Sequence, residues 1–432
     1  MSEFSYVRTE MLGEQEPPAG ETGIVHWLRS NMFSSVGNSV LTLAAFYFLY
    51  SLLSGILPWV FQSSWTANSL RECREAITLQ YGEGTTGACW SVINERYNQL
   101  LFGFYPKELY WRPILAFILL GVAIAPVLFD RFPRKMLMFT VIFPFLGFWL
   151  VWGGTIWLPI SVMLGFVIGY FAPSVLGPII GSLGGTIAAM VLPVLWWVFA
   201  TGGFANLVHS IIPIGLESVS SDQLGGFTLS VLIGITGITL SLPIGILLAL
   251  GRQSPLFVVK TLCVGFIEFI RGVPLITLLF VASTLLNYFM PPGTNFDLVL
   301  RVMIMVTLFA SAYMAEVIRG GLAALPKGQY EAADALGMNY WQATRLIIMP
   351  QALKISIPNI VSNFIGLFKD TTLVSIIGLL DPIGLSTAIR ANQEWNGIVW
   401  ELYAFVALMF WMVCFSMSRY SMYLERKLKT GH

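Results

Sequence analysis

The sequence is poor in charged residues. Asp, Glu, Lys and Arg make up only 11% of its 432 residues, against about 25% in an ordinary soluble domain. Five long stretches contain none of them, and these are residues 30–70, 136–216, 223–251, 272–296 and 402–418. Charge-free runs of this length are typical of helices that cross a bilayer. A soluble enzyme and a disordered chain are both excluded, because a chain that is 56% hydrophobic has to bury its surface in lipid or in itself.

Net charge and histidine content are also low. A net charge of +1 provides no long-range field for nucleic acid, so binding of nucleic acid is not expected. His26, His209 and His432 are scattered without the spacing of metal ligands, so no metal site is expected. No catalytic Ser-His-Asp or Cys-His arrangement is evident, and the first 30 residues lack the pattern of a secretory signal.

Two of the four cysteines share one polar segment. Cys73 and Cys89 lie within residues 62–110, whereas Cys263 and Cys414 lie in apolar stretches. A disulfide between Cys73 and Cys89 requires an oxidising compartment. Two unrelated free thiols are the alternative, and the sequence leaves both possibilities open.

The apolar runs predict the number of membrane crossings. A helix needs about 20 apolar residues to cross about 30 Å of hydrocarbon. The sequence therefore predicts an all-α fold, a polytopic transmembrane helical bundle with about ten spans. The expected spans are residues 38–61, 112–129, 136–152, 156–172, 181–200, 227–250, 263–290, 299–320, 355–380 and 397–419.

Basic residues gather in the connections that we expect on the cytoplasmic side. They occur in the turn 130–135, in the connections 251–260 and 321–354, and in the tail from residue 419. Loops rich in Lys and Arg usually lie in the cytoplasm. Counting back through ten spans then places both termini in the cytoplasm and residues 62–110 outside. Four basic residues of the outside segment run against this rule, which is weaker for long loops; they are Arg71, Arg74, Arg96 and Lys107.

The connection 321–354 is far longer than a turn between two spans requires. Pro326 suits a first helical turn, and Gly337 suits the left-handed residue that ends a helix. Asn339 and Gln342 have the spacing of a capping box that begins a second helix, which Pro350 is expected to close. We therefore predict two short helices. On geometry alone, an amphipathic hairpin resting on the membrane surface is the other interpretation.

This connection resembles the cytoplasmic EAA loop of bacterial ABC importer permeases. The matching positions are Glu331, Ala332, Ala333, Gly337, Ile347 and Pro350, with Met349 where the pattern usually has Leu. Residues 268–275, 315–321, 326–331 and 368–374 resemble permeases of the polar amino-acid uptake family. The resemblance covers about 224–425, and the chain is similar to the long subunits of general L-amino-acid and glutamate/glutamine/aspartate/asparagine permeases.

The resemblance implies a domain organisation. Residues 223–425 would form the type I ABC importer permease core, with a cytoplasmic coupling loop at 321–354. A polar cytoplasmic N-terminus (1–30) and an N-terminal transmembrane extension (31–222), with its external loop at 62–110, would precede the core. Residues 426–432 would form a cytoplasmic tail.

The resemblance also implies a function and partners. The chain would import polar L-amino acids across the bacterial inner membrane by alternating access, as a permease embedded in the lipid bilayer. Its partners would be a second, similar permease subunit, two copies of a cytoplasmic ATPase that docks on the EAA residues, and a periplasmic amino-acid-binding protein. The sequence has no G-x-x-x-x-G-K-[ST] phosphate loop. We therefore expect no enzyme activity and no cofactor in this chain, with ATP and Mg bound by the ATPase; an ion-coupled secondary amino-acid transporter is the alternative.

Two charged residues inside an expected span are candidates for the substrate path. Ionisable residues within spans usually face the interior of the bundle. Lys369 is suited to bind the carboxylate of an amino-acid substrate. The ammonium group of that substrate would meet acceptors or hydroxyls from Asp370, Thr371, Thr372 and Asn363. A structural role for Lys369 and Asp370, including a break in the span, is the other interpretation.

Two further Glu and Arg pairs lie near predicted span ends. Glu268 with Arg271, and Glu316 with Arg319, have the i, i+3 spacing of side chains that meet on a helix. Pairing within each helix or between subunits explains them better than a role in substrate binding.

Overall fold

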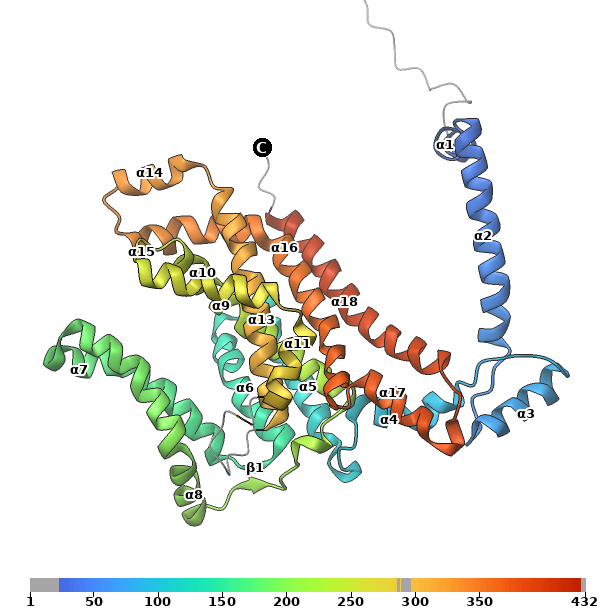
Figure 1. Ribbon diagram of the computed structural model, residues 1–432, viewed down its shortest axis with the longest axis horizontal. Helices are drawn as coiled ribbons and strands as arrows, with labels where there is room; N and C mark the ends of the chain where they lie inside the picture. Colours follow the sequence, from blue (N-terminus) through green and yellow to red (C-terminus); the bar gives the residue numbers. More distant parts are fainter. Residues whose placement is uncertain (1–22, 286–287, 289–296, 429–432) are drawn as a thin grey trace, which may run out of the picture. The chain divides into compact units, whose positions relative to one another are not determined.

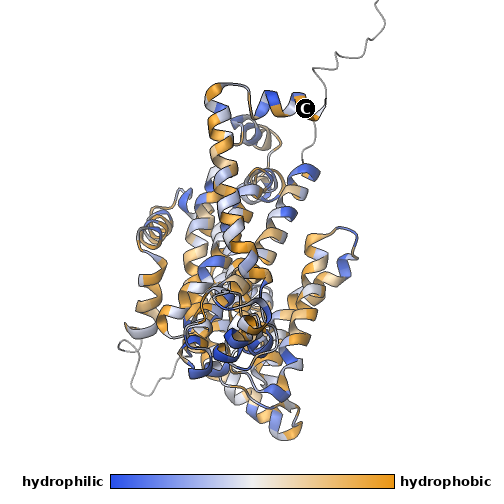
Figure 2. Ribbon diagram, turned by 90° about the vertical axis from the view of Figure 1, so that its right-hand side faces the viewer, coloured by the Kyte–Doolittle hydropathy of each residue, from blue (hydrophilic) through white to orange (hydrophobic). Residues whose placement is uncertain are grey.

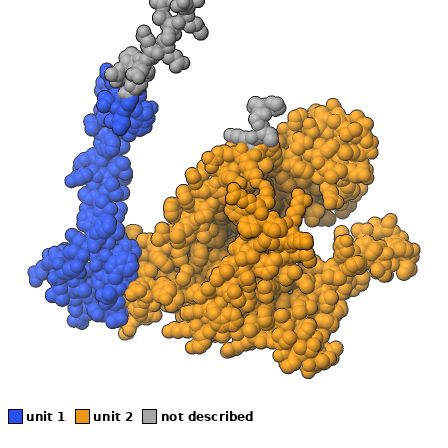
Figure 3. All heavy atoms as spheres, turned by 180° about the vertical axis from the view of Figure 1, so that it is seen from behind, with its two compact units in different colours: residues 1–91 blue, residues 92–432 orange. Residues whose placement is uncertain are grey.

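The computed structural model describes residues 23–285, 288 and 297–428. The described chain is almost entirely helical (Figure 1). It divides into two compact units, residues 1–91 and residues 92–432 (Figure 3). Figure 2 shows hydrophobic residues along most helices and hydrophilic residues concentrated in the connecting segments and helix ends. This distribution is that of a chain solvated by lipid along its helices.

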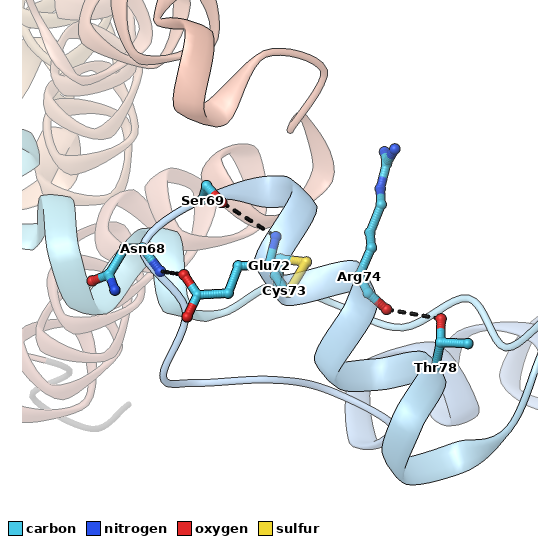
Figure 4. The surroundings of a disulfide bond; sticks show 7 residues. Asn68, Ser69, Glu72, Cys73, Arg74 and Thr78 are labelled. Atoms are coloured by element: carbon cyan, nitrogen blue, oxygen red, sulfur yellow. Dashed lines mark hydrogen bonds between the residues drawn. A yellow bond between two sulfur atoms is a disulfide. The ribbon is translucent and has the colours of Figure 1, made fainter.

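The first unit contains one long apolar helix and a disulfide-linked segment. Its helices are α1 (Ile24–Asn31), α2 (Val36–Phe61) and α3 (Leu70–Tyr81). At 26 residues, α2 is about 39 Å long, enough to cross a bilayer. Ser69 caps α3 by accepting from the Glu72 backbone N–H, and Glu72 accepts from the Asn68 backbone N–H (Figure 4). Cys73 in α3 forms a disulfide with Cys89, the linked alternative that the sequence left open.

The second unit is a helical bundle. Its α-helices are α4 (Ser91–Phe102), α5 (Trp111–Leu128), α6 (Leu137–Trp152), α7 (Trp157–Leu195), α8 (Thr201–Ile211), α9 (Gly226–Arg252), α10 (Phe257–Gly272), α11 (Leu275–Phe280), α13 (Leu298–Ala323), α14 (Lys327–Ala335), α15 (Tyr340–Ala343), α16 (Met349–Asp370), α17 (Pro382–Ala391) and α18 (Trp400–Leu428). Two short strands, β1 (Gly154–Thr155) and β2 (Gly215–Leu216), pair antiparallel.

The described residues contain eight helical segments long and apolar enough to span a membrane, or nine with one bent pair. The longest, Trp157–Ile211, is interrupted at Gly181, whose φ of 81° is not helical. The segment folds back at this residue. Two hydrogen bonds between its arms show this, since the indole N–H groups of Trp196 and Trp197 donate to the carbonyls of Ser161 and Val162. Residues 157–180 and 182–211 therefore form a helical hairpin.

The expected span 263–290 is not one continuous helix over its described part. The chain bends by 102° between Phe257–Gly272 and Leu275–Leu285. Pro274 causes the break, because proline has no backbone N–H and forces the preceding residue out of the helical region. Val273 is accordingly extended, with φ −108° and ψ 131°.

The centre of the bundle is formed by α9, α13 and α16. Small residues let these helices approach closely: a Cβ on Gly321 of α13 would lie 2.1 Å from Ser356 Oγ and 2.6 Å from the Ala352 carbonyl oxygen, both on α16. Two buried clusters line these contacts. One includes Leu229, Ile233, Val302, Val306 and Leu367, and the other includes Ala249, Ile267, Met314, Ile318 and Ala352. The second cluster lies toward α14, at what we call the loop end of the bundle.

Candidate functional site

The coupling loop contains the two predicted short helices, at the loop end of the bundle (Figure 1). The first, α14, ends at Gly337, which has a left-handed φ of 70°. Its N–H donates to the Asp334 carbonyl at 2.9 Å, and the Met338 N–H donates to the Ala333 carbonyl at 3.2 Å. These two bonds form a Schellman motif, which confirms the predicted helix end.

The second helix, α15, begins with the predicted capping box. The Gln342 N–H donates to Asn339 Oδ1 at 2.9 Å, and the Asn339 N–H donates to Gln342 Oε1 at 3.0 Å. The expectation that Pro350 closes this helix is wrong. The chain continues through a π-helical segment, Thr344–Ile348, directly into α16, where Pro350 occupies the first turn. Pro350 lacks the N–H of a helical hydrogen bond, and it closely follows the π-helical turn rather than a regular α-helical one.

The EAA residues do not all face outward. Glu331, Ala332, Gly337 and Pro350 are exposed, and Ile347 is half-buried. Ala333 is fully buried at 0% exposure, so it packs on its own chain. The exposed apolar surface of the loop comes instead from Tyr330, Leu336, Tyr340, Trp341 and Leu346, and Trp341 is 66% exposed. Tyr340 and Trp341 were not among the predicted docking residues, although two adjacent aromatic residues directly after a helix N-cap are a readable signal.

The coupling loop is firmly joined to the two helices that flank it. Only residues 324–326 separate α13 from α14, and the helix that begins at Tyr340 continues into α16. Gln351 Nε2 of α16 donates to Gln329 Oε1 of α14 at 2.9 Å. A force on α14 and α15 is therefore transmitted to α13 and α16.

Helices α13 and α16 also line an open cavity of about 290 Å³. The cavity is lined by Phe309, Ala310, Tyr313 and Met314 of α13, by Ser362, Asn363, Phe364, Gly366, Leu367 and Asp370 of α16, and by Ser241 of α9. The hydroxyl, amide and carboxylate groups among these residues can bind a small polar molecule.

The predicted substrate-path residues divide into two groups. Asn363 and Asp370 line the cavity. Lys369 is exposed and is not part of the lining. The hydroxyls of Thr371 and Thr372 donate to the carbonyls of Phe368 and Lys369 and thus bond to their own helix end. A 3-10 segment, Thr371–Ile377, follows directly, so the expected α-helical span 355–380 changes character at Asp370.

The two predicted Glu and Arg pairs also have different outcomes. Glu316 Oε2 accepts from Arg319 Nε at 2.9 Å, which confirms that pair. Glu268 pairs instead with Arg252 at 2.8 Å, because the neighbouring helix α9 ends beside it. Within the described residues, no three His, Cys, Asp or Glu side chains gather as metal ligands.

Comparisons with known proteins agree with the loop and the helical bundle. Residues 241–430 match the family described as binding-protein-dependent transport system inner membrane component. The chain is 56% identical over 433 residues to the glutamate/glutamine/aspartate/asparagine transport system permease protein BztC of Rhodobacter capsulatus, covering 100% of both chains. It is 40% identical to the inner membrane amino-acid ABC transporter permease protein YhdY of Escherichia coli, covering 94% of this chain and 93% of that protein.

Among solved structures, a crystal structure of an amino acid ABC transporter with histidines shares 29% identity, with a TM-score of 0.42, over 46% of this chain and 90% of that one. The full-length relatives do not favour the alternative of an ion-coupled secondary transporter. The chain belongs to the amino-acid permeases of ABC importers, multi-pass inner-membrane components of binding-protein-dependent transport systems.

Proposed function

We propose that this chain is one permease subunit of an importer for glutamate, glutamine, aspartate and asparagine. The observation that carries the proposal is the 56% identity along the full length to a permease named for these four substrates. The extension before residue 223 supports it, since the match includes that part of the chain. ATP hydrolysis then belongs to a separate subunit, which binds ATP and Mg.

The assembly has four kinds of subunit. This chain pairs with a second, similar but distinct permease, and two copies of a cytoplasmic ATPase dock on the pair. A periplasmic amino-acid-binding protein delivers the substrate from the outside. Both termini and the coupling loop lie in the cytoplasm, and the segment with Cys73 and Cys89 lies outside, where a disulfide persists.

The coupling loop carries the docking surface for the ATPase. Leu336, Tyr340 and Trp341 are exposed apolar side chains that follow one another closely in the loop. Exposed aromatic residues of this kind supply much of the binding energy of protein interfaces. Glu331 adds an exposed carboxylate beside them. Closure of the ATPase dimer would move α14 and α15, and hence α13 and α16 around the cavity.

The cavity is the part of the substrate path that this chain provides. Asp370 accepts the substrate ammonium group, and Asn363 offers its amide to the polar end of the substrate. None of the described lining residues is Lys or Arg. In this proposal, a positively charged partner for the substrate carboxylates comes from the second permease.

Two experiments test this proposal. The tagged chain is purified from membranes with its co-purifying proteins identified, and Glu331→Arg is compared with the parent. We expect recovery of an ATPase and a second permease, with the ATPase lost from the variant. Recovery of the chain alone would contradict the proposed assembly.

The second experiment compares uptake by Asp370→Asn and Lys369→Met in the reconstituted complex. A hydrogen bond to a charged group contributes about 1.5–3 kcal/mol, so we expect Asp370→Asn to weaken uptake at low substrate concentration about tenfold or more. Lys369→Met tests the other predicted charge, since Lys369 lies next to Asp370 in the sequence but is not part of the cavity lining. Normal uptake by Asp370→Asn would remove Asp370 from the path.

A further inference from the structure

A cluster of charged residues joins α9, α10 and α13 near the loop end. Its centre is Glu316 of α13, whose side chain is 16% exposed. One carboxylate oxygen, Oε1, accepts from Arg252 Nη1 at 2.8 Å, and the other accepts from Arg319 Nε at 2.9 Å. Arg252 also donates to Glu268 of α10. Arg252 of α9 thus links Glu316 of α13 to Glu268 of α10.

A third arginine connects this cluster to the cavity wall. Arg271 Nη1 lies 3.9 Å from Glu316 Oε1, and the Arg271 guanidinium carbon lies 5.6 Å from the centre of the Tyr313 ring. This second distance is that of a cation–π contact. Arg271 is also the last residue but one of α10, directly before the 102° bend at Val273 and Pro274. It therefore joins the bend to the aromatic ring of Tyr313.

Tyr313 and Met314 are the α13 lining residues nearest the coupling loop. The lining residues of α13 follow the order Phe309, Ala310, Tyr313 and Met314 toward α14. The Tyr313 ring packs on Phe309, with ring centres 4.8 Å apart. The ring therefore lies at the end of the cavity that faces the coupling loop.

We infer that Arg271 is a positioning residue for an inner gate, in which it holds the Tyr313 ring across the loop end of the cavity while Glu316 holds Arg271. The inference rests on the proposed function, since it assumes that the cavity is the substrate path. Movement of α13 with the coupling loop separates Arg271 from Tyr313 and Glu316, and the ring is then free to turn aside. Arg252 and Arg319 keep their hydrogen bonds to Glu316 when Arg271 moves away. Opening therefore leaves no unpaired buried carboxylate and avoids the cost of one.

The test measures access to the cavity from the cytoplasmic side. Gly366→Cys places a thiol on the cavity wall about one helical turn farther from the coupling loop than Ser362, at a position with open space for a side chain, in a background of Cys263→Ser and Cys414→Ser. The complete importer in inside-out vesicles is labelled with a membrane-impermeant maleimide, without nucleotide and with a non-hydrolysable ATP analogue. The slower of the two labelling rates reports the closed gate.

A cation–π contact shifts a closed-to-open equilibrium by about two- to thirtyfold. We expect Arg271→Met and Tyr313→Leu to raise the slower rate within this range and to leave the faster rate unchanged. Their double variant should match the single variants, because both act on one contact. Tyr313→Phe keeps the ring, and Arg319→Met alters Glu316 without touching Tyr313, so both should keep the parent rates within about twofold.

The inference is overturned if Arg271→Met leaves the slower rate unchanged, or if Arg319→Met raises it equally. Failure of the proposed function gives a different result. The parent importer would then show neither ATP-driven uptake nor any effect of nucleotide on the labelling rate. An unchanged faster rate in Arg271→Met, with normal recovery of the complex, separates loss of the gate from misfolding.

Discussion

Trp341 is predicted to be a main contact for the ATPase. Trp341 lies on α15, is 66% exposed and contacts the exposed ring of Tyr340. An aromatic side chain buries about 150–250 Å² when fully covered. Two-thirds of the middle of that range is roughly 130 Å², which at about 25 cal/mol per Å² corresponds to about 3 kcal/mol. Trp341→Ala should therefore weaken ATPase binding about a hundredfold.

The assay is binding of the purified ATPase subunit to the tagged permease pair in detergent, over a range of ATPase concentrations. Trp400→Ala is the matched control, since Trp400 is 71% exposed but lies at the start of α18, outside the coupling loop. We expect this control to bind within about threefold of the parent. The reasoning is refuted if Trp341→Ala binds like the parent, or if Trp400→Ala weakens binding as strongly.

Three further predictions concern the backbone of the loop, a buried acid and the disulfide. Gly337→Ala forces a residue with a side chain into the left-handed region, so it should destabilise the end of α14 by about 1–2 kcal/mol and lower uptake. Gly328→Ala on the same helix is the control and should do neither. Hydrogen exchange of α14 measures the difference. Burial raises the pKa of Asp381, the N-cap of α17, from 3.8 to about 6, so the folded chain keeps a proton that the unfolded chain releases between these values. Stability should therefore fall by about 3 kcal/mol as the pH rises from about 4 to about 6, and Asp381→Asn should remove this slope from thermal melting curves. Peptide mapping without reductant should recover Cys73 linked to Cys89, and Cys73→Ser should cost about 3 kcal/mol, given a sequence separation of 16 residues; recovery of both cysteines alkylated would contradict the link.

Features set by neighbouring residues could be predicted from the sequence. The helix end at Gly337 and the capping box of Asn339 and Gln342 depend on hydrogen bonds within a few residues. The apolar runs likewise predicted the crossings, because the length of a spanning helix is set by the bilayer. The break at Pro274 could also be predicted, since proline keeps Val273 out of the helical region. The expected span was based on the apolar run alone and therefore missed it.

Features that depend on packing between helices could not be predicted from the sequence. Successive residues on a helix point about 100° apart, so Asp370 lines the cavity while its neighbour Lys369 faces away from it. Asn363 and Asp370 are seven residues apart, which places them on one face, and this spacing was a readable signal. The partner of Glu268 required knowledge of where α9 ends, because Arg252 lies 16 residues away in the sequence.

The most direct test of the account is the energy source for uptake in proteoliposomes. The vesicles contain this chain with its co-purified permease and ATPase, and the binding protein is supplied with labelled glutamate. The account predicts uptake that requires ATP on the side of the coupling loop, persists when ionophores remove all ion gradients, and is abolished by Glu331→Arg. Uptake that proceeds without ATP and collapses with the ion gradient would contradict it.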